Sequence, residues 1–195
     1  MELLYICLIT IIPGFSHSID DPIIDRYFTS EDAHQLDSIL TFFNQQILSD
    51  CQGNKDIVHC YQEYFNRLDT SGIYTGISYE EQQDLYESIG EVLWKKIWEY
   101  QTEKKYDSTS RLVTSKELNY SLQGSYMKFL KDVAEEEPYF KQYVNPIEVS
   151  GDLSPALFKG FLYDPSGLDF SNQRHQLIIA LHFLTFNDKL NNMPN

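Results

Sequence analysis

Two cysteines are the first residues of this chain whose types and spacing could do chemistry. Cys51 and Cys60 bound the stretch CQGNKDIVHC, and His59 directly precedes the second cysteine. The pair could form a disulfide, remain as free buried thiols, join His59 in a metal site, or supply a catalytic nucleophile. The last two uses are disfavoured, because neighbouring side chains diverge by about 100° on a helix and a structural zinc site needs four ligands. We therefore predict no metal site and no catalytic cysteine here.

Whether the two cysteines can form a disulfide depends on the backbone between them. On one continuous helix they would lie about 13.5 Å apart along the axis, whereas a disulfide needs Cα atoms within about 7 Å. Gly53 and Asn54 tolerate the left-handed conformation that ends helices. The sequence therefore predicts a tight corner between two helices, closed by a Cys51–Cys60 disulfide if the chain reaches an oxidising compartment.

His182 is the second candidate, because it lies in the most apolar segment of the chain, residues 177–184. His175 stands seven residues earlier on nearly the same helical face, with Arg174 beside it. A histidine whose protonation is shifted by desolvation can mark a functional site; a hydrogen-bonded core histidine is the alternative. If a pocket exists, we expect His182 to line it, with His175 and Arg174 at its rim.

Two tryptophans form the third candidate. Trp94 and Trp98 lie four residues apart and flank two lysines, so on a helix their indoles would form one stripe. The same helix would bury Val92 and Tyr100 on its aliphatic face. The stripe could be core packing, or it could be a surface anchor for a ligand or partner.

No other motif assigns chemistry or a cofactor. The chain contains no glycine-rich phosphate loop, nucleophile elbow or HExxH sequence. Residues 69–80 have acidic residues at the first and last positions of an EF-hand loop. However, Ile73 and Tyr74 occupy the positions that need an oxygen donor and a glycine. We therefore predict no metal ion and no cofactor, and we assign no catalytic residue.

Composition and charge limit the classes of protein to which this chain could belong. The chain has 195 residues, of which 42% are hydrophobic and 23% charged, and these values are typical of one globular domain. The net charge of −14 leaves no basic stripe to neutralise phosphates. We therefore expect no nucleic-acid partner and no docking on an anionic membrane surface.

The N-terminal residues 1–18 predict a cleaved signal peptide. Residues 3–12 form an apolar run that is too short to cross a bilayer, which takes about 20 residues. Ser16 and Ser18 are small residues that suit cleavage after position 18. Cleavage would also remove Cys7 and leave an even number of cysteines. Because Glu2 precedes the run without Lys or Arg, a cytoplasmic protein with a buried N-terminal helix is the alternative.

Helical periodicity dominates the rest of the chain. Apolar residues recur mostly every 3.6 residues, whereas the alternation of strands is almost absent, and residues 111–114 could pair at most briefly. Helices are expected over residues 30–47 with Thr29 or Ser30 as N-cap, 57–68, 79–102 with Ser78 as N-cap, 118–133, 154–162, and 171–190 with Ser171 as N-cap. The last helix is apolar nearly all round, so we expect it to be the central one.

The sequence thus predicts an all-α fold: residues 19–195 form one irregular bundle of about six helices with a mostly buried C-terminal helix. Since no catalytic constellation stands out, we expect a soluble, non-enzymatic binding or protein-interaction module that is exported to the periplasm or the extracellular space and whose partner is a protein or a small molecule. The mature chain would have no transmembrane span. A hydrolase-type enzyme with a cleft around His182 is the alternative.

Overall fold

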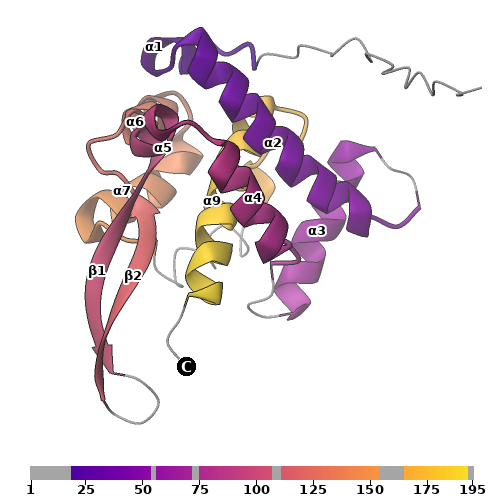
Figure 1. Ribbon diagram of the computed structural model, residues 1–195. Coiled ribbons are helices and arrows are strands. Elements are labelled where there is room, and N and C mark those ends of the chain that lie inside the picture. The colour runs from indigo at the N-terminus through magenta and orange to yellow at the C-terminus, as the bar shows by residue number, and fades with distance from the viewer. Residues whose placement is uncertain (1–18, 54–55, 72–74, 107–110, 154–164, 193–195) are drawn as a thin grey trace, which may run out of the picture.

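The computed structural model describes residues 19–53, 56–71, 75–106, 111–153 and 165–192. In this part of the chain the fold consists of eight α-helices and a two-stranded sheet that lies at one side of them (Figure 1). The elements are α1 (Ile24–Tyr27), α2 (Ser30–Asp50), α3 (Ile57–Ser71), α4 (Tyr79–Ser88), α5 (Glu91–Ile97), β1 (Trp98–Tyr106), β2 (Leu112–Tyr120), α6 (Ser125–Glu136), α7 (Lys141–Ser150) and α9 (Gln173–Asn191), with 3-10 turns at Pro138–Phe140 and Pro165–Gly167. The predicted signal peptide and the predicted helix over residues 154–162 lie outside the described residues.

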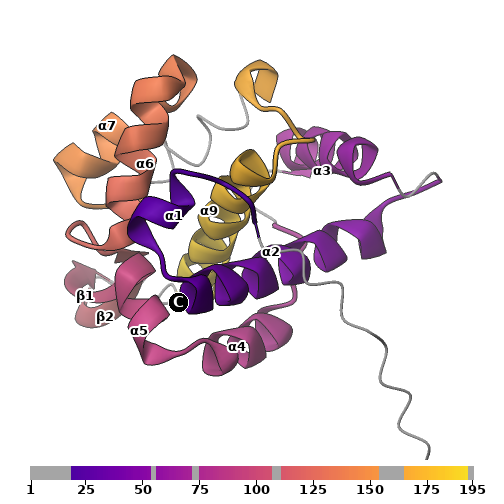
Figure 2. The same ribbon diagram turned by 90° about the horizontal axis from the view of Figure 1, so that it is seen from above.

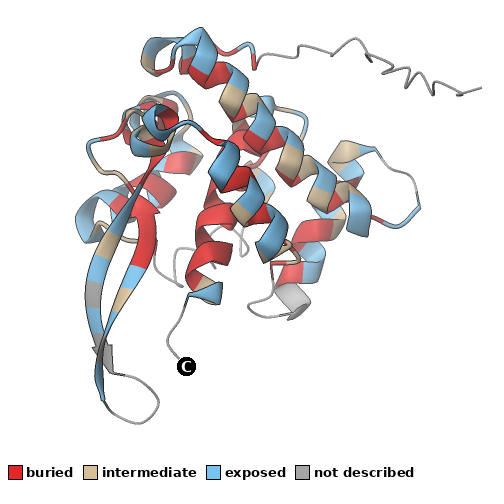
Figure 3. Ribbon diagram, viewed as in Figure 1, coloured by how far each residue is buried: buried red, intermediate tan, exposed pale blue. Residues whose placement is uncertain are grey.

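Helix α9 is the centre of the bundle, as its composition predicts. All its residues from His175 to Lys189 are buried, and Figures 2 and 3 show it surrounded by the other elements. Helices α2 and α4 and strand β2 all pack against it. Among the described residues, no helix is long and apolar enough to cross a membrane.

The expected helix over residues 79–102 is wrong, because the chain breaks twice within it. Helix α4 ends at Ser88, and Gly90 then starts α5 with its N–H directed to Gln35 Oε1 at 2.8 Å instead of to a helical carbonyl. Glycine costs about 1 kcal/mol relative to alanine inside a helix, which favours a break there. The second break falls at Trp98, where β1 begins.

The predicted all-α fold is confirmed only in part: the described chain is mostly helical, but β1 and β2 form an antiparallel hairpin with Trp98 opposite Tyr120 and Tyr100 opposite Leu118. Leu118 therefore belongs to a strand rather than to the expected helix over residues 118–133, which begins only at Ser125. The base of the hairpin is buried in the core, whereas Figure 1 shows its far half extending away from the helices.

Local capping signals were predicted more accurately than element ends. Thr29 and Asp32 form the complete capping box of α2. The last helix is capped by Asn172, whose side chain accepts from Arg174 N, rather than by Ser171. Helix α7 continues through Pro146.

Candidate functional site

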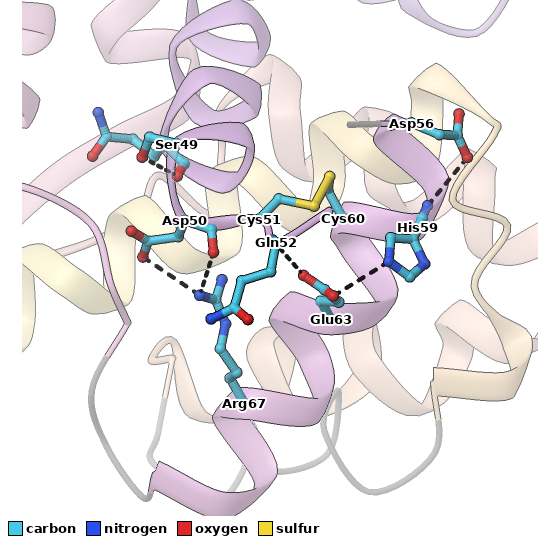
Figure 4. The surroundings of a disulfide bond; sticks show 10 residues. Ser49, Asp50, Cys51, Gln52, Asp56, His59, Cys60, Glu63 and Arg67 are labelled. Carbon is cyan, nitrogen blue, oxygen red and sulfur yellow. Dashed lines mark hydrogen bonds and ion pairs between the residues drawn. A yellow bond between two sulfur atoms is a disulfide. The ribbon is translucent and has the colours of Figure 1, made fainter. Parts of the chain in front are cut away.

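The predicted pairing of the two cysteines is present at the corner between α2 and α3 (Figure 4). Cys51 follows the last residue of α2 and Cys60 lies in the first turn of α3; their Cα atoms are 5.3 Å apart and their sulfurs 2.07 Å apart. Gly53, with φ of 80°, supplies the left-handed residue that the turn requires. Because both sulfurs are bonded and buried, neither is a metal ligand or a nucleophile in this state.

Polar side chains tie the same corner together outside the disulfide. The Glu63 carboxylate accepts a hydrogen bond from Gln52 N at 3.0 Å and lies 3.2 Å from His59 Nε2. Arg67 donates to the carbonyl of Asp50 at 3.0 Å. A hollow of about 270 Å³ beside them is lined by Asp50, Gln52, Glu63, Asn66 and Arg67. His59 thus turns toward Glu63 rather than toward the sulfurs, and the corner is structural.

His182 is completely buried. Its exposed fraction is 0%, its Nδ1 lies 3.1 Å from the Tyr143 hydroxyl, and that hydroxyl lies 3.3 Å from the Tyr120 hydroxyl. The rings of Tyr143 and Phe183 pack edge-on against it. Burial lowers the pKa of His182 to about 3, so the ring is neutral. The structure gives no support to a cleft around His182, since the ring does not reach solvent.

Arg174 lies in a different environment, between the N-terminal segment and the end of α6. Its Nε is 2.5 Å from Asp21 Oδ2, and its Nη1 is 2.9 Å from Glu137 Oε1. Burial by itself would raise the pKa of Asp21, but the hydrogen bonds from Arg174, Ile23 and Ile24 hold it below its ordinary value. Arg174 therefore fastens the N-terminal segment to α9.

His175 belongs to the same cluster. Its Nδ1 accepts from Asp169 N at 2.8 Å, so the ring proton is assigned to Nε2, which donates to Glu137 at 2.7 Å. His175 and His182 therefore contact different partners, Glu137 and Tyr143. The predicted grouping of these histidines around one pocket is not seen in their contacts.

The tryptophans instead join a chain of aromatic rings that runs from the core to the surface. Trp98 is 1% exposed, and its indole N–H donates to Thr185 Oγ1 at 2.8 Å. Trp94 is half-buried, and its ring centroid lies 4.9 Å from Trp98, 4.9 Å from Tyr86 and 6.1 Å from Tyr100. Both alternatives for the stripe thus apply: Trp98 is core, whereas Trp94 reaches the surface.

Tyr100 and Val92 were expected on the buried face of a helix, and both are exposed. Tyr100 is 50% exposed and Val92 70%. The Tyr100 ring lies on the hairpin face that carries Trp98, because strand residues two apart share a face. Burial, followed by the charge of Asp188 and by Tyr79, raises the pKa of Tyr100 to about 12. Helical spacing predicted burial of Tyr100 because it does not reveal the break at Trp98.

Comparisons with protein-family models, with curated proteins and with solved structures found no match to this chain. Within the described residues, no group of three or more His, Cys, Asp or Glu side chains could hold a metal ion. What the structure offers is thus a structural disulfide, two buried polar clusters, and one aromatic surface formed by Trp94 and Tyr100. This pair is called the aromatic surface below.

Proposed function

We propose that the mature chain is an exported, disulfide-bonded helical domain that acts by binding a partner protein, with the aromatic surface of Trp94 and Tyr100 as its docking site. The observation that carries this proposal is the path of the aromatic chain. It starts at Trp98 in the core and ends at Tyr100, which is half exposed. Large aromatic side chains fixed at a surface are typical anchors of protein interfaces.

The aromatic surface is held in place before any partner arrives. Trp98 is fixed by its hydrogen bond to Thr185, and Trp94 packs against both Trp98 and Tyr86. Tyr100 is fixed by the antiparallel register of the hairpin. A side chain that is already ordered loses little conformational entropy on binding, so less of the interaction energy is spent on ordering it.

Export is supported by the Cys51–Cys60 disulfide, because cytosolic proteins seldom keep disulfides. N-terminal sequencing of the mature protein is expected to begin at Ile19, and thiol labelling without reductant is expected to find no free cysteine. A retained Met1 would contradict export.

The hydrolase alternative has no observation in its favour, because His182 is sealed from solvent. No second function is therefore proposed.

Site-specific photo-crosslinking tests the docking proposal. A photoreactive phenylalanine analogue is placed at Tyr100 and, as the matched control, at Val149, which is 90% exposed on α7. In the extracellular fluid of the producing cells, we expect one saturable product from position 100 and none from position 149, and an excess of unlabelled wild type should abolish it. The same products from both positions, or none from either, would overturn the proposal.

A further inference from the structure

The aromatic surface lies in a strongly acidic part of the chain. We propose that it binds a basic segment of its partner, whose Arg or Lys side chains stack on Trp94 and Tyr100. This inference rests on the proposed function and assigns the class of partner.

The charge on the α4–α5 side of the aromatic surface is mostly acidic, whereas the hairpin side carries the exposed Lys104 and Lys116 on the face of Tyr100. Residues 79–100 contain six acidic and two basic residues, and both lysines are already engaged. Lys95 Nζ lies 2.5 Å from Glu91 Oε1, and Lys96 is ion-paired with Asp32. The remaining acidic residues of this stretch, Glu80, Glu81, Asp84, Glu87 and Glu99, are exposed. The α4–α5 side would therefore repel an acidic partner and attract a basic one from a distance.

The edge of α4 next to the aromatic surface consists of uncharged side chains and contacts one carboxylate of α9. Tyr79, Gln83 and Tyr86 follow one another at helical spacing, and Tyr86 packs against Trp94 at 4.9 Å. Gln83 Nε2 donates to Asp188 Oδ2 at 3.5 Å. The Asp188 carboxylate therefore lies behind the same edge.

The chemistry of the two rings matches a cationic side chain. The face of an indole or phenol ring carries negative electrostatic potential, and a guanidinium or ammonium group stacked on it gains about 0.5–1 kcal/mol at an exposed site, or about two- to five-fold in affinity. Surrounding carboxylates add a further attraction that salt screens. Aromatic faces and carboxylates together thus favour Arg and Lys over apolar or acidic side chains.

The chain contains its own reporter for this test, since its two tryptophans are Trp94 and Trp98. The probes are two short synthetic helical peptides with the same leucine face; the polar face is arginine in one and glutamate in the other. We expect the arginine peptide to change the tryptophan emission saturably, with an affinity that falls as salt rises. The glutamate peptide is expected to give no change. Equal response to both peptides, or to neither, overturns the inference.

Two sets of variants separate stacking from charge. Tyr100→Phe keeps the ring and should bind the arginine peptide like wild type, whereas Tyr100→Leu should bind about two- to five-fold more weakly. The matched control is Val92→Ser on α5, which is exposed and points away from Trp94 because residues two apart lie on opposite sides of a helix.

Glu80→Gln combined with Glu87→Gln changes exposed positions of α4 and does not disturb the core. This variant should weaken binding at low salt and reduce the salt dependence. Unchanged binding in both Tyr100→Leu and the glutamine variant would refute the inference. The crosslinking result at position 100 would then still stand, so failure of the basic-partner inference is distinguishable from failure of the docking proposal.

Discussion

Lowering the pH is expected to destabilise this protein through one buried histidine. The His182 ring is 0% exposed, and burial lowers its pKa from 6.5 to about 3. In the folded protein the ring stays neutral above about pH 3, whereas in the unfolded chain it takes up a proton as the pH falls through 6.5. Protonation therefore favours the unfolded state. The stability that is complete above pH 6.5 declines between pH 6.5 and pH 3.

The size of this decline follows from the difference between the two pKa values. Each pH unit well inside the window costs about 1.4 kcal/mol, so the free energy of unfolding should fall by about 2 kcal/mol between about pH 6 and about pH 4.5. Asp21 acts in the same direction at lower pH. Its pKa is held below 3.8 by Arg174, so its stabilising effect is lost only as the pH falls below that value.

Urea unfolding followed by tryptophan fluorescence at several pH values measures the effect, with His182→Asn as the comparison. The amide keeps an acceptor for the Tyr143 hydroxyl but does not titrate, so the stability difference between the two proteins should narrow by about 2 kcal/mol over that range. Tyr143→Phe is the control. It removes the 3.1 Å contact with His182 but leaves the ring buried, so it should keep the wild-type slope. If wild type and His182→Asn decline in parallel, the reasoning is wrong.

Three further predictions concern stability. Cys51 and Cys60 are nine positions apart, and replacing both with alanine should lower the free energy of unfolding by about 2.7 kcal/mol in the chain-entropy model. A loss below about 1 kcal/mol, measured by urea unfolding, would show that other contacts hold the corner without the disulfide. Arg174→Met leaves the carboxylate of Asp21, which is 9% exposed, without its cation, so the free energy of unfolding should fall by about 3 kcal/mol. Arg26→Met removes a side chain that is 57% exposed and should lower it by less than about 1 kcal/mol. Equal losses for these two variants in the same titration would refute that reasoning. Gly151 ends α7 with φ of 70°, so Gly151→Ala should cost about 1 kcal/mol and Gly151→Asn less; an alanine variant with an unchanged melting temperature would contradict this.

The parts of the fold that could be predicted from the sequence are those determined by neighbouring residues. The N-cap of α2 depends on Thr29 and that of α4 on Ser78, each bonded to a backbone N–H three residues later, and the cysteine corner depends on Gly53 between two helical segments. The burial of α9 could be predicted because its sequence is apolar on nearly every side of the helix. In each case the determining residues lie within one or two turns of one another.

The hairpin could not be predicted because only its base is buried. A strand reveals itself by alternation when one face lies against a core. On the hairpin face that carries Trp98, only Trp98 of β1 and Leu118 and Tyr120 of β2 are buried, while the far half of that face is exposed at Thr102 and Lys104. Glu117 and Asn119 are buried on the other face, so the burial at the base of β2 does not alternate. One or two buried positions on one face of a strand are too few to outweigh the helical spacing on either side of it. Burial of Trp98 against α9 decides the outcome, and that contact spans 87 residues.

The candidate site shows the same division between local and long-range determinants. The burial of His182 follows from its apolar neighbours, but its partner Tyr143 lies 39 residues away in sequence, and Glu137, the partner of His175, lies 38 away. Periodicity placed both histidines on one helical face. It carried no information about which side chains contact each histidine in the folded protein. Sequence spacing therefore could not show that the two histidines have separate partners.

The break at Trp98 is also what creates the aromatic surface. On one continuous helix, Trp94 and Tyr100 would point about 120° apart and lie about 9 Å apart along the axis, so a single partner side chain could not lie against both rings. Ending α5 at Ile97 and continuing as a strand brings the two ring centroids to 6.1 Å. The same break leaves Trp98, between them in sequence, buried against Thr185 as the anchor. A variant that restored a helix through position 98 would therefore separate the two rings and remove the anchor together, so the hairpin and the proposed docking site should be lost as one unit.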